Sequence, residues 1–224
     1  MRDLESILSD NRSGSSKIIK NTLELLKDTD EDERLEICKK ILDTHPSMAG
    51  LRFIVDNIES GMKINKIIDK FEEMNRRTSE NLEKIAENKI VTVISRSHIV
   101  ERGLLKAKKI NVLESRPEKE GIDTFRWLKD RGKKAEIYLD AFMSYAVKNS
   151  DIVVSGADSL LEEGFINKTG TLPLALTARH FNKDFYVAAP SYKFIDLCPE
   201  FDSNFEFVER TLVTEFIQEK QKQL

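Results

Sequence analysis

One short polar segment has the composition of an anion-binding site. Residues 167–171 read Asn-Lys-Thr-Gly-Thr and lead directly into a predicted helix, with Pro173 near its first turn. Free backbone N–H groups at a helix start, the helix dipole and the Lys168 ammonium would together favour a phosphate. The plainer alternative is a capped helix start beside a solvated lysine. The position of this segment at the edge of a predicted sheet favours the phosphate site.

Asp158 is a second candidate for chemistry, because it follows Gly156-Ala157 at the end of a predicted strand. A buried carboxyl there would have its proton affinity raised by desolvation and could serve as a general acid. An aspartate after Gly-Ala is also a common turn or helix-cap residue, and spacing alone slightly favours the cap. Both interpretations of Asp158 stay open at this point.

The chain lacks the motifs of ordinary nucleotide and metal sites. No predicted strand is followed by Gly-x-Gly-x-x-Gly, and there is no phosphate-loop Gly-Lys-Ser/Thr. The two cysteines, Cys38 and Cys198, show neither metal-ligand spacing nor a disulfide framework. We therefore expect no cofactor and no metal site, and we expect a cytoplasmic protein in a reducing compartment.

The charge balance excludes a protein held mainly by nucleic-acid phosphates. The chain has 36 basic and 39 acidic residues; residues 1–88 carry 15 and 19 of them, and residues 89–224 carry 21 and 20. Neither part is a basic surface of the kind that binds DNA or RNA. No apolar run approaches the roughly 20 residues of a membrane span, and the N-terminus lacks the apolar core of a signal peptide. We expect no direct binding to nucleic acid and no membrane association.

The first 88 residues show the hydrophobic periodicity of helices. Apolar residues recur three or four positions apart in four segments, at residues 18–26, 35–42, 51–58 and 62–87. Gly61 is expected to end the third helix. We interpret residues 1–88 as a helical N-terminal domain.

After Asn88 the periodicity changes to that of alternating strands and helices. Strands are predicted at residues 90–94, 110–113, 136–139, 152–154 and 185–189, and helices at about 98–108, 122–131, 141–148 and 172–181. This alternation predicts right-handed βαβ units. The fold class is therefore α/β, with a doubly wound, mostly parallel, Rossmann-like sheet in a second domain of residues 89–224. Residues 209–224 are polar and compatible with a helix.

Polar side chains follow every predicted strand. They are Ser95-Arg96-Ser97-His98, Glu114-Ser115-Arg116-Pro117, Asp140, Ser155-Gly156-Ala157-Asp158 and Pro190-Ser191-Tyr192-Lys193. In an open parallel sheet, ligands bind beyond the carboxyl ends of the strands. We expect these residues to gather along one rim, where an apolar sheet has no packing use for them.

Several of these motifs together resemble a known family. The segments Gly156-Ala157-Asp158, GFINKTGT (164–171) and FYVAAP (185–190) resemble the aldose-phosphate isomerases related to translation initiation factor 2B. That family includes methylthioribose-1-phosphate isomerase, ribose-1,5-bisphosphate isomerase and the alpha, beta and delta subunits of the initiation factor. The segment ESRP (114–117) also resembles the end of the family's second strand. The order, the spacing and the helical N-terminal region agree, so the resemblance covers most of the chain.

The resemblance implies an acid–base pair of which this chain keeps one member. Family isomerases use a cysteine after the first strand and the aspartate of Gly-Ala-Asp; here these positions are Ser95 and Asp158. A thiol can be tuned to ionise near neutral pH, whereas a serine hydroxyl needs a neighbouring base. In addition, Thr44-His45-Pro46 stands where the family has Thr/Ser-Arg-Pro, and histidine lacks the planar, permanently charged fork of arginine. Both departures argue against efficient isomerisation.

The resemblance also implies contacts to a ligand. Arg12, in Arg12-Ser13-Gly14, imperfectly matches an N-terminal Arg-Gly segment that binds substrate phosphate. Asn167, Lys168 and Lys193 match substrate-contacting positions, and Ser97 matches a polar one.

Two functions follow from these observations. The first is a regulatory or interaction protein similar to the initiation-factor subunits, which binds a sugar phosphate or nucleotide, dimerises through its α/β domain and has a translation-related protein partner. The alternative is an aldose–ketose isomerase acting on a sugar 1-phosphate, such as ribose-1,5-bisphosphate or methylthioribose-1-phosphate. Asp158 would then be the acid–base residue, with Ser95 or His98 in place of the thiol. A purely structural protein without a ligand is a third possibility.

Overall fold

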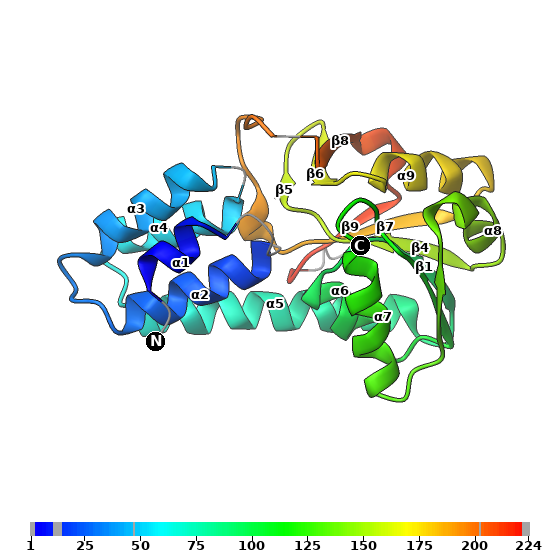
Figure 1. The fold of residues 1–224 in the computed structure, drawn as a ribbon, viewed down its shortest axis with the longest axis horizontal. Coiled ribbons are helices and arrows are strands. Elements are labelled where there is room, and N and C mark those ends of the chain that lie inside the picture. Colours follow the sequence, from blue (N-terminus) through cyan, green and yellow to red (C-terminus); the bar gives the residue numbers. More distant parts are fainter. Residues whose placement is uncertain (1–2, 11–14, 47, 202, 221–224) are drawn as a thin grey trace.

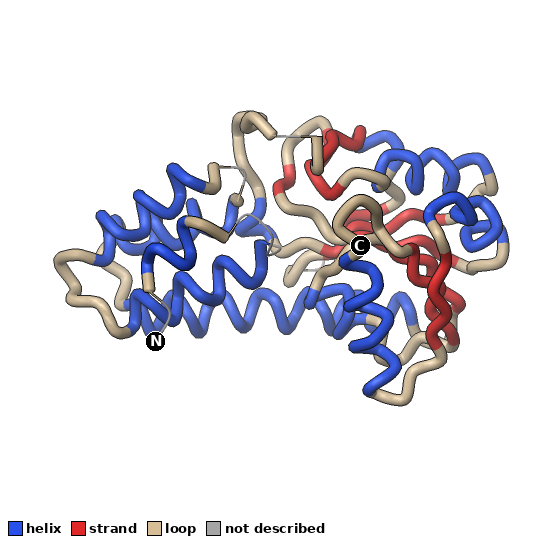
Figure 2. The backbone as a smooth tube through the Cα atoms, viewed as in Figure 1, coloured by secondary structure: helices blue, strands red, loops and turns tan. Residues whose placement is uncertain are grey.

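The structure is a computed structural model that describes residues 3–10, 15–46, 48–201 and 203–220. Figures 1 and 2 show a helical part beside a part built on β-sheets, with one long helix running along both. Within the described residues, every helix is too short or too polar to traverse a lipid bilayer.

The helices of the N-terminal part share one apolar core. They are α1 (Leu4–Leu8), α2 (Ser15–Lys27), α3 (Arg34–Thr44), α4 (Ala49–Glu59) and α5 (Ile64–Ala86). Residues at helical spacing, such as Leu51, Ile54 and Val55, are buried as their periodicity predicts. Helices this short are marginal in water alone, so this shared burial holds them folded. The short helix α1 was not expected; the Asp3 side chain caps it by accepting the Ser6 N–H at 2.8 Å.

Helix α5 belongs to two cores. Its first half places Ile67 and Phe71 among the N-terminal helices, and its second half places Leu82 and Ala86 under the large sheet. The helix therefore ties the two parts together along its length (Figure 1). The division of the chain into two domains near residue 88 stays a prediction.

The large sheet confirms the predicted α/β fold. Its strand order is β3-β2-β1-β4-β7-β9, and every neighbouring pair is parallel. The strands are β1 (Ile90–Val93), β2 (Lys109–Leu113), β3 (Ala135–Tyr138), β4 (Ile152–Ser155), β7 (Asp184–Ala188) and β9 (Glu215–Ile217).

Helices cover both faces of this sheet (Figure 1). Helices α5, α6 (His98–Gly103) and α7 (Glu120–Asp130) contribute to the core on one face, and α8 (Met143–Lys148) and α9 (Thr171–His180) to the core on the other. Along β4, Ile152 and Val154 belong to the first core and Val153 to the second, as the alternation of side chains in a strand requires.

The prediction for the end of the chain is wrong over the described residues 209–220. In place of a helix, β8 (Phe205–Glu209) is followed by a 3₁₀ turn, η3 (Arg210–Leu212), and by β9. Phe216 and Ile217 pack on opposite faces of the sheet, as neighbouring residues of a strand do. A strand of three residues in a polar segment is too short for this alternation to be recognised in the sequence.

A second, antiparallel sheet was also not predicted. It has the order β5-β6-β8, with β5 (Ser159–Leu160) and β6 (Gly164–Lys168). Its strand β6 carries Asn167 and Lys168 and leads into α9, so this sheet sets the position of two candidate site residues.

Candidate functional site

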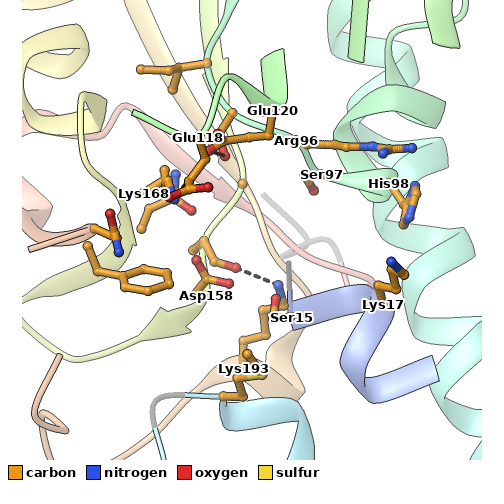
Figure 3. A pocket seen from close by; sticks show the side chains of 18 of the residues that line it. Ser15, Lys17, Arg96, Ser97, His98, Glu118, Glu120, Asp158, Lys168 and Lys193 are labelled. Carbon is orange, nitrogen blue, oxygen red and sulfur yellow. Dashed lines mark hydrogen bonds and ion pairs between the residues drawn. The ribbon is translucent and has the colours of Figure 1, made fainter. Parts of the chain in front are cut away.

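The site lies where the order of the large sheet reverses. Strands β1 and β4 are neighbours, but the chain leaves them toward opposite edges of the sheet, and such a switch point opens a crevice at the carboxyl ends of the strands. A cavity of about 360 Å³ occupies this position, between the loops after β1 and β4. Figure 3 shows the side chains around it.

The cavity brings together six of the seven sequence-predicted site residues. They are Ser95, Ser97, Asp158, Asn167, Lys168 and Lys193. The seventh, Arg12, lies outside the described residues. The N-terminal helices also reach the cavity, through Ser15, Lys17 and Met48.

Gly156 allows the two loops to approach closely. A Cβ atom at this position would lie 3.0 Å from Ser97 Cβ and 3.1 Å from Ser97 Oγ. Ser97 in turn caps α6, where its hydroxyl accepts the Val100 N–H at 3.4 Å. Glycine at 156 thus keeps Ser97 and the loop of Asp158 side by side.

Ser95 sits in an unusual backbone conformation and already has a carboxylate partner. Its φ of +64° lies in the left-handed region, which non-glycine residues rarely adopt. The Ser115 hydroxyl accepts its N–H at 2.7 Å, and its own hydroxyl donates to Glu120 Oε1 at 3.0 Å. The position that the resemblance assigns to a thiol therefore holds an alcohol bonded to a carboxylate.

The sequence analysis missed Glu120, the first residue of α7. Its Oε1 lies 3.9 Å from Lys168 Nζ, while its Oε2 is buried and has no hydrogen-bond partner among the described residues. Burial raises the pKa of Glu120, although its own backbone N–H, Lys168 and Ser95 act in the opposite direction. Its place two residues before the predicted helix at 122–131 was the one available signal, and acidic residues are common there for capping alone.

Lys168 faces the cavity, but the helix start beside it does not. The Leu172 N–H of α9 is taken by Glu206 Oε1 at 2.7 Å, and Pro173 has no N–H. Gly170 and Thr171 are not among the described residues that line the cavity. The expectation that this helix start holds a phosphate is therefore wrong, and only its lysine side chain remains available.

Asn167 supports the same turn. Its Nδ2 donates to Thr171 Oγ1 at 2.9 Å, and that hydroxyl donates to the carbonyl of Lys168 at 2.6 Å. Asn167 is buried and lines the cavity, so it joins the end of β6 to the start of α9.

Asp158 is half-buried, and the structure removes its helix-cap interpretation. Strand β5, not a helix, follows it, and its N–H donates to the Ile166 carbonyl at 2.8 Å. Its carboxylate lines the same cavity as Lys168.

Lys193 is buried, with 5% of its surface exposed. Its Nζ donates to the carbonyl of Ala157 at 2.6 Å, the contact drawn as a dashed line in Figure 3. Burial lowers the pKa of the Lys193 ammonium, and the charge of Asp158 opposes this effect in part.

The other ionisable groups at the cavity are largely paired. Arg96 lies 3.2 Å from the fully buried Glu101 and 3.7 Å from Asp123, and His98 Nδ1 lies 2.9 Å from the second oxygen of Glu101. The cavity therefore mixes cations with carboxylates, which suits a ligand that carries both an anionic group and hydroxyl groups.

His45 is not one of the described residues that line the cavity. It is buried, and its Nε2 lies 3.1 Å from the Ile7 carbonyl, which ties the end of α3 to α1. The segment Thr44-His45-Pro46 thus has a structural contact in this chain. Among the described residues, no group of three or more His, Cys, Asp or Glu is placed so that it could hold a metal ion.

Comparisons with known proteins point to one family. A model described as the initiation factor 2 subunit family matches residues 12–223. A translation initiation factor eIF-2B subunit 2-like protein of Pyrococcus furiosus is 29% identical over 219 residues, which cover 91% of this chain and 79% of that protein. A ribose 1,5-bisphosphate isomerase of Methanocaldococcus jannaschii is 27% identical over 173 residues, 69% of this chain and 56% of the isomerase.

Solved structures agree in fold. The crystal structure of the Pyrococcus horikoshii OT3 translation initiation factor eIF-2B matches with a TM-score of 0.80 and 26% identity, covering 96% of this chain and 93% of that one. A chain of the tetrameric eIF2B-beta2-delta2 complex from C. thermophilum matches with a TM-score of 0.72 at 17% identity, covering 97% and 90%.

Proposed function

This chain belongs to the initiation factor 2 subunit family, and on that premise we propose that it is a regulatory or interaction protein of the eIF-2B type. In this proposal it binds a sugar phosphate or a nucleotide in the switch-point cavity, without efficient catalysis. The observation that carries the proposal is the hydroxyl of Ser95 at the position of the family's thiol, bonded to Glu120 in a cavity that Lys168 and Lys193 also line.

The cavity suits such a ligand in size and charge. Its volume of about 360 Å³ lies in the range of small-molecule pockets. Lys168 and Lys193 would engage the phosphate, with Arg12 as a further candidate. Carboxylates such as Asp158 would accept hydrogen bonds from the ligand's hydroxyl groups.

Weak catalysis follows from the chemistry of Ser95. An alcohol does not ionise near neutral pH as a tuned thiol does, and loss of a positioned acid–base group removes roughly 10²–10⁴ in rate. Ligand binding can survive this loss, because Asn167, Lys168 and Lys193 do not depend on the thiol.

The alternative is an aldose–ketose isomerase acting on a sugar 1-phosphate, and one observation favours it. Glu120 supplies Ser95 with a neighbouring carboxylate, which a serine needs in order to replace a thiol. Asp158 would be the second acid–base residue.

We also propose a cytoplasmic homodimer that meets a translation-related partner. Large apolar side chains on η1 (Asp140–Phe142), α8 and α9 are at least half exposed and support an interface on the α/β part; they are Phe142, Tyr145 and Leu176. Both cysteines are free thiols, which is compatible with a reducing compartment.

Thermal unfolding tests the proposed ligand site. Ribose 5-phosphate, AMP and ribose 1,5-bisphosphate at millimolar concentration should raise the Tm, because a ligand that binds only the folded state stabilises it by mass action. The shift should be lost in Lys168→Met and kept in Lys66→Met, which removes an exposed lysine of α5 away from the cavity. An unchanged Tm across the panel would contradict phosphate binding, and turnover of ribose 1,5-bisphosphate that disappears in Asp158→Asn would favour the isomerase.

A further inference from the structure

Lys193 is a buried amine without an anionic partner. Lysines are rarely buried unless they are paired. Within the described part of the chain, no carboxylate oxygen lies within 4.0 Å of Lys193 Nζ, whereas Lys168 has Glu120 at 3.9 Å. Lys193 therefore lacks the nearby carboxylate that Lys168 has, and a carboxylate is what stabilises the charged form of a buried ammonium group.

The hydrogen bond that Lys193 Nζ makes within the described part of the chain does not require a positive charge. A neutral amine can donate one N–H to the Ala157 carbonyl and still present a second N–H and its lone pair to the cavity. Burial lowers the pKa of this group below its ordinary value of 10.5, and Asp158 offsets the effect in part. Each unit of lowering raises the neutral fraction near pH 7 about tenfold.

Hydrogen bonds tie the two residues before Lys193 to two other segments of the chain, α5 and the segment that follows β9. The preceding Tyr192 donates to Asn75 Oδ1 at 2.8 Å and packs between the rings of Phe53 and Phe71. Ser191, at the start of the same 3₁₀ turn, η2 (Ser191–Lys193), donates its N–H to Glu219 at 2.9 Å. These contacts hold the backbone next to Lys193, and the hydrogen bond to the Ala157 carbonyl places its Nζ.

We propose that Lys193 forms a reversible imine with the carbonyl carbon of an open-chain phosphorylated aldehyde or ketone. The proposal rests on the ligand site proposed above and adds a covalent step to it. Lys168, Lys193 and Asp158 all line this cavity (Figure 3). In the proposed complex, Lys168 faces the phosphate of the ligand, Lys193 faces its carbonyl group, and Asp158 carries the protons.

The step balances without any further reactant. The Nζ lone pair attacks the carbonyl carbon and a C–N bond forms, and the Asp158 carboxylate passes a proton from this nitrogen to the former carbonyl oxygen, which gives a neutral carbinolamine. Asp158 then takes up one proton from solvent and delivers it to the carbinolamine hydroxyl, the C–O bond breaks, and water leaves. The amine, the carbonyl and one proton are thereby converted to an iminium ion and one water.

Reductive trapping tests this proposal. Erythrose 4-phosphate is a suitable probe, because its phosphorylated terminal hydroxyl prevents closure to a furanose ring and leaves a free aldehyde. The full chain is treated with the probe and sodium cyanoborohydride at pH 7, and peptide mass mapping locates the secondary amine. We expect one adduct per chain, at Lys193, with an occupancy about tenfold above that of any exposed lysine.

Two variants keep the result interpretable. Lys193→Arg retains the charge but is not nucleophilic, and Lys193→Met replaces the amine by an apolar chain; each should abolish the adduct. Labelling that spreads evenly over exposed lysines away from the cavity, such as Lys66, or that persists at equal total yield in both variants, would overturn the imine.

Erythritol 4-phosphate separates this proposal from the proposed function, because it carries the phosphate without the carbonyl. If it raises the Tm while erythrose 4-phosphate gives no adduct at Lys193, the imine is refuted and the ligand site stands. If an adduct forms at Lys193 but erythritol 4-phosphate leaves the Tm unchanged, the imine stands and phosphate binding fails.

Discussion

The Ser95 hydroxyl donates to Glu120 Oε1 at 3.0 Å. This hydrogen bond joins the loop after β1 to the first residue of α7. The second oxygen of Glu120 is buried without a partner among the described residues. The pair gives the cavity a titratable group directly beside the position of the family's thiol. It also makes Glu120, like Lys193, a group of this site whose pKa is shifted by burial.

We predict that Glu120→Gln removes a pH-dependent loss of stability. The pKa of Glu120 is raised in the folded state above its ordinary value of 4.5, mainly by burial, so the folded chain holds this proton more tightly than the unfolded chain. The contribution of Glu120 to wild-type stability therefore falls as the pH rises from the ordinary pKa through the folded-state pKa. The Tm of the variant relative to wild type should increase from about pH 4 to pH 7.

Glutamine keeps an oxygen that can accept the Ser95 hydroxyl, so the variant tests the charge and not the hydrogen bond. Glu72→Gln, at an exposed position of α5 away from the cavity, is the control and should show no such trend. A Tm difference for Glu120→Gln that shrinks with rising pH would mean that Lys168 outweighs burial.

We predict that Gly170→Ala destabilises the fold more than Gly132→Ala. Both glycines have positive φ angles, +101° and +71°, which cost an alanine about 1 kcal/mol or more. At 170 the new Cβ would also lie 2.6 Å from Ile94 Cδ1, whereas at 132 nothing lies within 4 Å. Urea unfolding should give a loss of about 2–3 kcal/mol at 170 and about 1 kcal/mol at 132. Equal losses would show that Ile94 yields without cost.

We predict that Asp140→Asn loosens the loop after β2. The two carboxylate oxygens of Asp140 accept the N–H groups of Ser115 at 2.9 Å and of Arg116 at 2.7 Å. Asparagine can accept only one of these and opposes the other with its own N–H, so a loss of about 1–2 kcal/mol is expected. Asp130→Asn, on the exposed end of α7, should stay within about 0.5 kcal/mol of wild type by the same unfolding measurement.

The same Asp140 variant should also weaken ligand binding, because Ser115 carries the hydrogen bond to the Ser95 N–H. The thermal shift with ribose 5-phosphate measures this effect. A full ligand shift in a destabilised Asp140→Asn would show that the cavity does not depend on this loop.

We predict that Tyr192→Phe weakens the connection between the N-terminal helices and Lys193. The variant keeps the ring contacts with Phe53 and Phe71 but leaves Asn75 Oδ1 without its donor, at a cost of about 0.5–1.5 kcal/mol. Tyr145→Phe, at an exposed position, should leave stability unchanged in the same unfolding experiment. No difference between the two variants would mean that water replaces the Tyr192 hydroxyl.

Much of the fold could be read from local patterns. The apolar run at residues 90–94 and the alternation after it predicted parallel strands with helices between them, and the large sheet has that arrangement. Strand β9 escaped prediction because three residues are too few to show a period, and pairing with β7 stabilises it. Strand β5, with two residues, escaped for the same reason.

The site could be predicted in part. Residues that follow strands, such as Ser95, Ser97 and Asp158, line one cavity because the ends of parallel strands share an edge. The start of α9 was misjudged, because its Leu172 N–H donates to the carboxylate of Glu206. Glu206 lies on β8, 34 residues further along the chain, and local sequence does not reveal this contact.

The sequence by itself predicted most of the polar residues that line the cavity and the edge of the sheet at which they lie, because strand and helix periods are properties of near neighbours. Only the tertiary structure decided their partners and their charge states. Glu120 reaches Ser95 across 25 residues, and Lys193 reaches the Ala157 carbonyl across 36. Burial and pairing at such separations depend on how whole elements pack, and it is burial that shifts the proton affinities of these two groups.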